Sequence, residues 1–163
     1  MKPKLMKDLA RLFVILNFSL APLAGFAAED KKGDAALMEP VKSVYDHYLA
    51  IQTELAKDSI KGVDEHANAI AKAVKADEMK MLPNDVASQA ESLAKAKDLK
   101  DARDAFKPLS ASLIKYLGDN KAGKGLYHEV YCPMAKASWL QKGQGIKNPY
   151  MGKQMLACGS LKS

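Results

Sequence analysis

Two cysteines and three methionines in the last part of the chain could act together as soft metal ligands. The cysteines are Cys132 and Cys158, and the methionines are Met134, Met151 and Met155. Thiolate and thioether sulfurs favour Cu(I), with Ag(I) as its chemical relative, over magnesium, calcium or manganese. The residue types therefore predict a Cu(I)- or Ag(I)-binding site in this part of the chain.

The first half of the predicted site is a short extended segment. Apolar and polar residues alternate over residues 126–131, which is typical of a strand. Cys132 and Met134 are two residues apart and would point to the same side of an extended chain. His128 lies four residues before Cys132 and would share that side, which makes it a further candidate ligand.

The second half of the predicted site is a short helix over residues 149–158. Asn148 followed by Pro149 is a typical helix start, with Asn as the cap and Pro in the first position. Residues three and four apart share one face of a helix, so three sulfur side chains would lie side by side. These are Met151, Met155 and Cys158.

Two histidines and the single tryptophan are the other residues with a possible chemical role. His47 and His66 each stand alone in a helical pattern, and a lone helical histidine is usually a surface or core residue. Trp139 lies between the two halves of the predicted sulfur site in the sequence. Its ring could cover a bound ion through a cation–π contact.

Residues 1–27 have the organisation of a secretory signal. A basic stretch over residues 2–11 precedes an apolar run over residues 12–20 and a small-residue stretch that reaches Ala27. The apolar run is shorter than the roughly 20 residues that a membrane span needs, and no later segment is long enough. Cleavage near Ala27 would leave residues 28–163 as an exported protein without an integral membrane span.

A disulfide between Cys132 and Cys158 is the competing interpretation, because paired cysteines are common in exported proteins. This bond would close a loop of about 26 residues and stabilise the segment by roughly 3 kcal/mol. The methionines would then be packing residues, since Met fills irregular gaps in cores. The two interpretations are compatible, because a reducible pair could switch the site between two states.

Four amphipathic stretches must position this segment, and they predict an up-and-down four-helix bundle. Apolar residues recur at steps of three and four over residues 37–55, 59–76, 83–94 and 98–117. Short joints make neighbouring helices antiparallel, and Pro108 is expected to kink or split the fourth helix. We expect an all-α fold, with the bundle in residues 28–125. The short irregular Cys- and Met-containing segment, residues 126–163, packs on the bundle as part of the same domain.

Charge is unevenly distributed along the 163 residues, whose formal net charge is +6. Residues 28–120 carry 14 basic and 17 acidic side chains, whereas residues 121–163 carry seven lysines, no arginine and one acid. Without arginine this basic segment lacks the planar fork that reads phosphates, so we expect no nucleic-acid partner. We find no nucleophile–base pair, phosphate-binding loop or haem-attachment motif, and we expect a binding protein rather than an enzyme.

The last part of the chain resembles the hallmark of a bacterial periplasmic helical domain family of unknown function. The block reads Cys-Pro-Met at residues 132–134, Trp-Leu at 139–140, Asn-Pro-Tyr at 148–150 and Met-Leu-Ala-Cys-Gly at 155–159. Members of this family occur alone or attached to the adaptor (membrane-fusion) proteins of heavy-metal efflux pumps for copper and silver. The resemblance extends over the whole exported chain, with a helical bundle first and this block last.

The resemblance implies a free-standing periplasmic protein that binds Cu(I) or Ag(I) as a buffer, chaperone or accessory of heavy-metal efflux. The family's candidate metal residues would be Cys132, Met134, Met155 and Cys158. Met151 departs from the family pattern, which often has an aromatic residue there. The alternative is a helical interaction module without a metal, whose tail is locked by a Cys132–Cys158 disulfide and whose basic surface binds an acidic partner.

Overall fold

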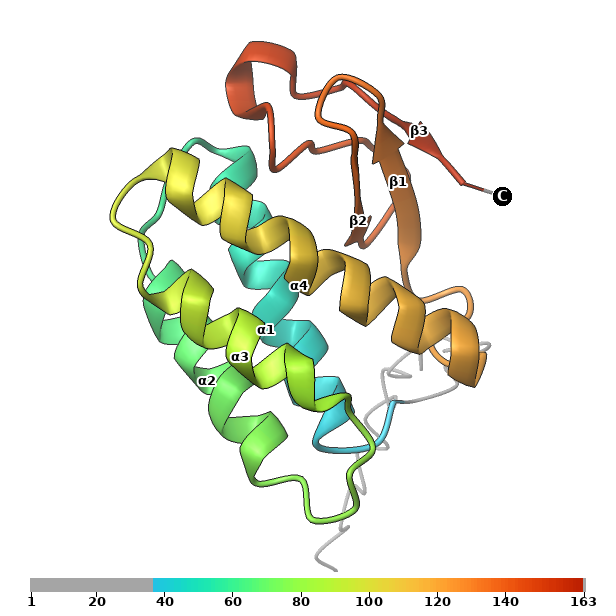
Figure 1. The fold of residues 1–163 in the computed structure, drawn as a ribbon. Helices are drawn as coiled ribbons and strands as arrows, with labels where there is room; N and C mark the ends of the chain where they lie inside the picture. Colours follow the sequence, from blue (N-terminus) through green and yellow to red (C-terminus); the bar gives the residue numbers. More distant parts are fainter. Residues whose placement is uncertain (1–36, 163) are drawn as a thin grey trace, which may run out of the picture. The chain divides into compact units, whose positions relative to one another are not determined.

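The computed structural model describes residues 37–162, so the predicted secretory signal lies outside the described residues. Four helices come first and confirm the four predicted ones (Figure 1): α1 (Val41–Ala56), α2 (Val63–Lys75), α3 (Asn84–Ala94) and α4 (Leu99–Asn120). The remaining elements are β1 (His128–Cys132), β2 (Ala137–Gln141), the 3-10 helix η1 (Gly152–Met155) and β3 (Ser160–Leu161). No helix in this part of the chain has both the length and the apolar character of a membrane span.

The helix α4 begins and ends where the sequence predicts and is not divided at Pro108. The Asp98 carboxylate accepts a hydrogen bond of 2.8 Å from the Asp101 backbone N–H, which caps the first turn. The helix runs through Pro108 to Asn120, so the predicted split does not occur. Pro108 lies on the exposed side, where water can solvate the carbonyl that has lost its amide partner.

The helices pack on one another in chain order, α1 on α2, α2 on α3 and α3 on α4. Their apolar faces form one buried core, whose largest helical side chains include Tyr45, Tyr48, Phe106, Ile51, Leu55, Ile70, Leu93, Leu109 and Leu113. The strand β2 packs against both α4 and α1. The core of the bundle is therefore completed by a segment from the end of the chain.

A small antiparallel sheet makes the fold mainly helical and not purely all-α, which corrects the predicted fold class. The strand order is β2-β1-β3, and Val130 in the central strand pairs with Trp139 on one side and Leu161 on the other. The alternating pattern before Cys132 does form β1. Its two partners are short strands without a comparable pattern, so their existence depends on pairing with β1 and packing on the helices.

The helix predicted over residues 149–158 is reduced to the single turn of η1. The Asn148 side chain does cap this region, because its Oδ1 accepts hydrogen bonds from the backbone N–H groups of Tyr150 (2.8 Å) and Met151 (3.0 Å). Gly152, the first residue of η1, takes a left-handed conformation with φ +53°, which prevents one regular helix from running over residues 149–158. Consequently Met151, Met155 and Cys158 do not share one face of a regular helix.

Residues from the sheet and its following loop belong to the same core as the helices. Val130, Trp139 and Tyr150 are buried, and the Trp139 side chain is fully inaccessible to solvent. The Tyr48 hydroxyl on α1 accepts a 3.0 Å hydrogen bond from the backbone N–H of Leu140 in β2. The last part of the chain is thus joined to the bundle by both apolar and polar contacts.

Candidate functional site

Cys132 and Cys158 lie side by side although 26 positions separate them. Cys132 is the buried last residue of β1, and Cys158 is a half-buried residue between η1 and β3. No disulfide joins them, and their Sγ atoms are 2.6 Å apart, which is close enough for the pair to form one. The fold therefore brings together two of the residues predicted to be soft ligands or disulfide partners.

Local hydrogen bonds make the two thiols chemically different. Burial opposes ionisation of Cys132, but hydrogen bonds from the Cys158 thiol, from the backbone N–H groups of Ala135 and Met134 and from the Asn148 amide outweigh it. The pKa of Cys132 is lowered as a result. The pKa of Cys158 is raised, mainly because its proton is held in the hydrogen bond to Cys132. These directions favour Cys132 as the member of the pair that ionises first.

Asn148 fixes the loop that carries Cys158. This side chain is fully buried, and its Nδ2 donates a 2.7 Å hydrogen bond to the Cys158 carbonyl. The Asn148 backbone N–H also donates to the Leu156 carbonyl at 2.9 Å. The sequence indicated a capping role for Asn148, but its contact with the cysteine region depends on how residues 149–157 loop back.

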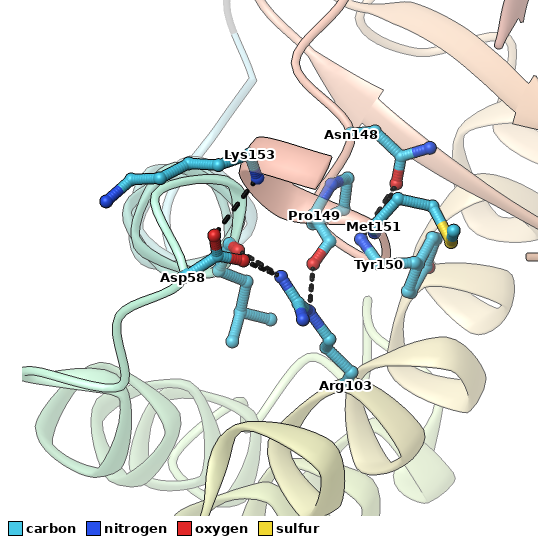
Figure 2. Close-up of polar contacts among 8 residues, drawn as sticks. Asp58, Arg103, Asn148, Pro149, Tyr150, Met151 and Lys153 are labelled. Carbon is cyan, nitrogen blue, oxygen red and sulfur yellow. Dashed lines mark hydrogen bonds and ion pairs between the residues drawn. The ribbon is translucent and has the colours of Figure 1, made fainter. Parts of the chain in front are cut away.

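An ion pair between α4 and the segment after α1 fastens the same loop to the bundle (Figure 2). The Arg103 guanidinium on α4 donates to the Pro149 carbonyl at 2.8 Å and to an Asp58 carboxylate oxygen at 2.5 Å. The other Asp58 oxygen accepts the Lys153 backbone N–H at 3.1 Å. The Arg103 hydrogen bond, together with that from Lys153, holds the pKa of Asp58 below its usual range. Sequence reasoning missed this anchor, because the residues come from three distant segments.

The predicted methionine ligands lie in three different parts of the last segment. Met134, in the turn between β1 and β2, is 65% exposed, and Met155, at the end of η1, is 38% exposed. Met134 and Met151 line one open groove of about 510 Å³, together with Tyr150 and residues of α4. The exposed thioethers of Met134 and Met155 are free to change rotamer towards a ligand.

His128 lies at the opposite end of β1 from Cys132, and Trp139 is buried next to Gly159. His128 begins β1 and Cys132 ends it, so the two residues are about 13 Å apart along the strand. The Trp139 ring is buried against Tyr150, with ring centres 6.0 Å apart. Its edge also faces Gly159, where an added Cβ would lie 3.0 Å from the ring. Trp139 therefore packs against Gly159, the residue that follows Cys158.

A further pair of residues comes together that the sequence treats as separate. His47 on α1 and His66 on α2 have their Nδ1 atoms 3.0 Å apart, and both side chains are half-buried. Burial lowers the pKa of His47, and the charge of His66 lowers it further. Only the register of the α1–α2 hairpin could have indicated this contact, and that register depends on the irregular connection over residues 57–62.

Within residues 37–162, no cluster of three or more His, Cys, Asp or Glu side chains is placed to hold a metal ion. A metal at the thiol pair would therefore need thioether sulfur or solvent to complete its coordination. The arrangement favours soft metals over magnesium or calcium, which require several oxygen ligands.

Comparisons with known proteins relate the helical part of the chain to one family. No curated protein and no solved structure gives a significant match. The family described as "Protein of unknown function (DUF3347)" matches residues 44–125, which run from α1 through α4 to the loop before β1. The match covers just over half of the 163 residues. The chain therefore belongs to this family of proteins of unknown function.

Proposed function

We propose that the protein binds Cu(I) or Ag(I) through the thiolates of Cys132 and Cys158, with thioether ligation from Met134 and Met155. It would act as a periplasmic buffer, chaperone or accessory of heavy-metal efflux, by binding rather than by catalysis. The observation that supports the proposal is the convergence of the two thiols, from the end of β1 and from the loop before β3, each within three residues of an exposed methionine in the sequence.

A bound ion requires a modest rearrangement of the pair. Metal–thiolate bonds of about 2.3 Å place two sulfurs on one tetrahedral ion roughly 3.7 Å apart, whereas the Sγ atoms of the free thiols are 2.6 Å apart. The half-buried Cys158 side chain can supply this movement by a change of rotamer, while Asn148 holds its backbone. Cys132 is fixed by β1 and by the hydrogen bonds of the turn that follows.

The cellular context of the proposal comes from the sequence. The secretory signal over residues 1–27 and the resemblance of the last part of the chain to efflux-associated domains both support a periplasmic location. Copper and silver efflux is also the setting in which a soft-metal carrier would be useful. The thioether and thiolate donor set is suited to Cu(I).

The test is an anaerobic Cu(I) titration of the reduced protein against a competing chelator. We expect one ion per chain, and we expect the Cys132→Ser, Cys158→Ser double variant to lose competition with the chelator. Met134→Leu and Met155→Leu should each weaken binding. Met79→Leu is the matched control, because Met79 is 76% exposed in the segment between α2 and α3. Undiminished affinity in the double serine variant would overturn the proposal.

The second candidate is an interaction module without a metal, whose tail is locked by a Cys132–Cys158 disulfide. It is favoured by the close approach of the two sulfurs, which is shorter than a shared metal ion needs. The lysines of residues 121–163 would then face an acidic partner. Mass measurement with thiol alkylation distinguishes the candidates. A quantitative disulfide in protein from the periplasm, with no copper uptake after reduction, selects the second.

A further inference from the structure

The paired histidines on α1 and α2 have the geometry of a metal chelate. Their Nδ1 atoms are 3.0 Å apart, and the two rings are inclined by 43° with centres 5.2 Å apart. We propose that His47 and His66 form a second metal site, specific for borderline divalent ions such as Cu²⁺, on the face formed by α1 and α2. This inference does not depend on the proposed Cu(I) function of the cysteines.

The distance between the nitrogens fits a single ion. Metal–imidazole bonds are about 2.0–2.1 Å long, so two nitrogens 3.0 Å apart subtend roughly 91–97° at the metal. That angle is close to a pair of adjacent ligands in square-planar coordination. In the metal-free protein the same two nitrogens share one hydrogen bond. A rotation about the broad χ2 torsion of each histidine turns both lone pairs towards an ion.

The two ligands are held by elements that are already packed together. His47 lies within α1, and His66 lies in the first turns of α2, where its backbone N–H donates to the Gly62 carbonyl at 3.0 Å. The apolar faces of both helices are buried in the core, so the chelate is preorganised by the fold. Both rings are half-buried, which leaves the remaining coordination positions open to water.

The surrounding charges leave the imidazoles as the ligands. Within residues 37–162, no Asp or Glu joins the two histidines in a cluster that could hold a metal ion. Asp46, which precedes His47, is engaged by Lys42 at 2.5 Å and by Lys142 at 3.8 Å. A site with two neutral nitrogen ligands and water suits Cu²⁺, Zn²⁺ or Ni²⁺, and Cu²⁺ binds most tightly in the series. The donor type differs from that of the thiols, so the two sites would select different oxidation states of copper.

The experiment uses Cu²⁺ alone, added to a Cys132→Ala, Cys158→Ala variant so that thiols cannot reduce the metal. Competition titration should give one ion per chain, and electron paramagnetic resonance should show coupling to two nitrogens. His47→Ala and His66→Ala should each weaken binding by roughly 100-fold, since loss of a group that merely supports a ligand already costs about 10- to 100-fold. His128→Ala is the matched control, because it removes the third histidine of the chain from a different element.

Equal affinities in the His47→Ala, His66→Ala and His128→Ala variants would overturn the proposal, as would a spectrum without nitrogen coupling. A second measurement covers the case in which the cysteine variant does not fold. In the reduced protein with native cysteines, added Zn²⁺ should shift the imidazole resonances of His47 and His66 together and leave those of His128 in place. Unchanged His47 and His66 resonances would also overturn the proposal. Failure of the reduced protein with native cysteines to bind Cu(I), with Cu²⁺ binding to the histidines intact, would contradict only the function proposed for the cysteines.

Discussion

The loop of the last segment approaches the bundle closely at Gly152. Its left-handed backbone, with φ +53°, lets the chain pass directly over the Asp58–Arg103 ion pair. A Cβ at this position would overlap the Asp58 carboxylate and the Arg103 guanidinium. The hydrogen bond from the neighbouring Lys153 backbone to Asp58 depends on the same approach.

We predict that Gly152→Ala destabilises the protein by at least about 2 kcal/mol, because a left-handed alanine alone costs roughly 1–2 kcal/mol and the overlap adds to that cost. The free energy of unfolding from urea denaturation measures the effect. Gly143→Ala is the matched control, since Gly143 has φ +76° but no heavy atom within 4 Å of an added Cβ. Equal losses in the two variants would show that the overlap at residue 152 is relieved at no cost.

For single residues, the sequence predicts chemical roles better than it predicts contacts. Soft ligands could be recognised in Cys132 and Cys158 from their chemistry, and Asn148 could be recognised as a cap. The His47–His66 contact could not be predicted, because it depends on the register between two helices. The predicted grouping of Met155 with Cys158 relied on a regular helix, which the conformation of Gly152 prevents.

The helix α1 and the strand β2 are joined through a buried polar network. Tyr48 is fully buried, and its hydroxyl accepts the Leu140 backbone N–H at 3.0 Å while sharing a 2.8 Å hydrogen bond with the Ser110 hydroxyl of α4. One tyrosine thus links three elements. The Gln52 side chain adds a second link from α1, a 2.6 Å hydrogen bond to the Lys147 carbonyl.

We predict that Tyr48→Phe lowers the free energy of unfolding by about 1–3 kcal/mol, because it leaves a buried backbone N–H without its acceptor. Thermal or urea denaturation measures the change. Amide hydrogen exchange at Leu140 should also accelerate relative to the other amides of β2. Tyr116→Phe serves as the control, since it removes a hydroxyl from a half-buried tyrosine on α4. A loss of stability no larger than in that control would mean that water replaces the hydroxyl.

Elements with a strong local pattern were predictable, and elements that depend on a partner were not. The four helices carry their own apolar periodicity, and α4 also has its Asp98 cap. The strands β2 and β3 are stabilised by pairing with β1, which a short sequence does not reveal. The predicted bundle is therefore correct in its helices and incomplete without the sheet.

In the whole molecule, the single tryptophan lies where residues 126–162 pack on the helices. Trp139 is fully buried, and it contacts Tyr150, whose ring lies 5.9 Å from that of Phe106 on α4. The matched family region ends at residue 125, before this tryptophan. If the segment after residue 125 is part of one cooperative core, the helices and the sheet must unfold together.

We predict that Trp139 fluorescence and far-ultraviolet circular dichroism give the same urea midpoint in the reduced protein. The fluorescence reports the segment after residue 125, whereas the circular dichroism reports mainly α1–α4. Reduction ensures that no disulfide contributes to the result. The Gly152→Ala variant should lower both midpoints together, since its loop is fastened to α4 and to the segment after α1 through Arg103 and Asp58. A fluorescence transition at lower urea, with the helices intact, would show that the segment is a separable unit and that the bundle is stable without it.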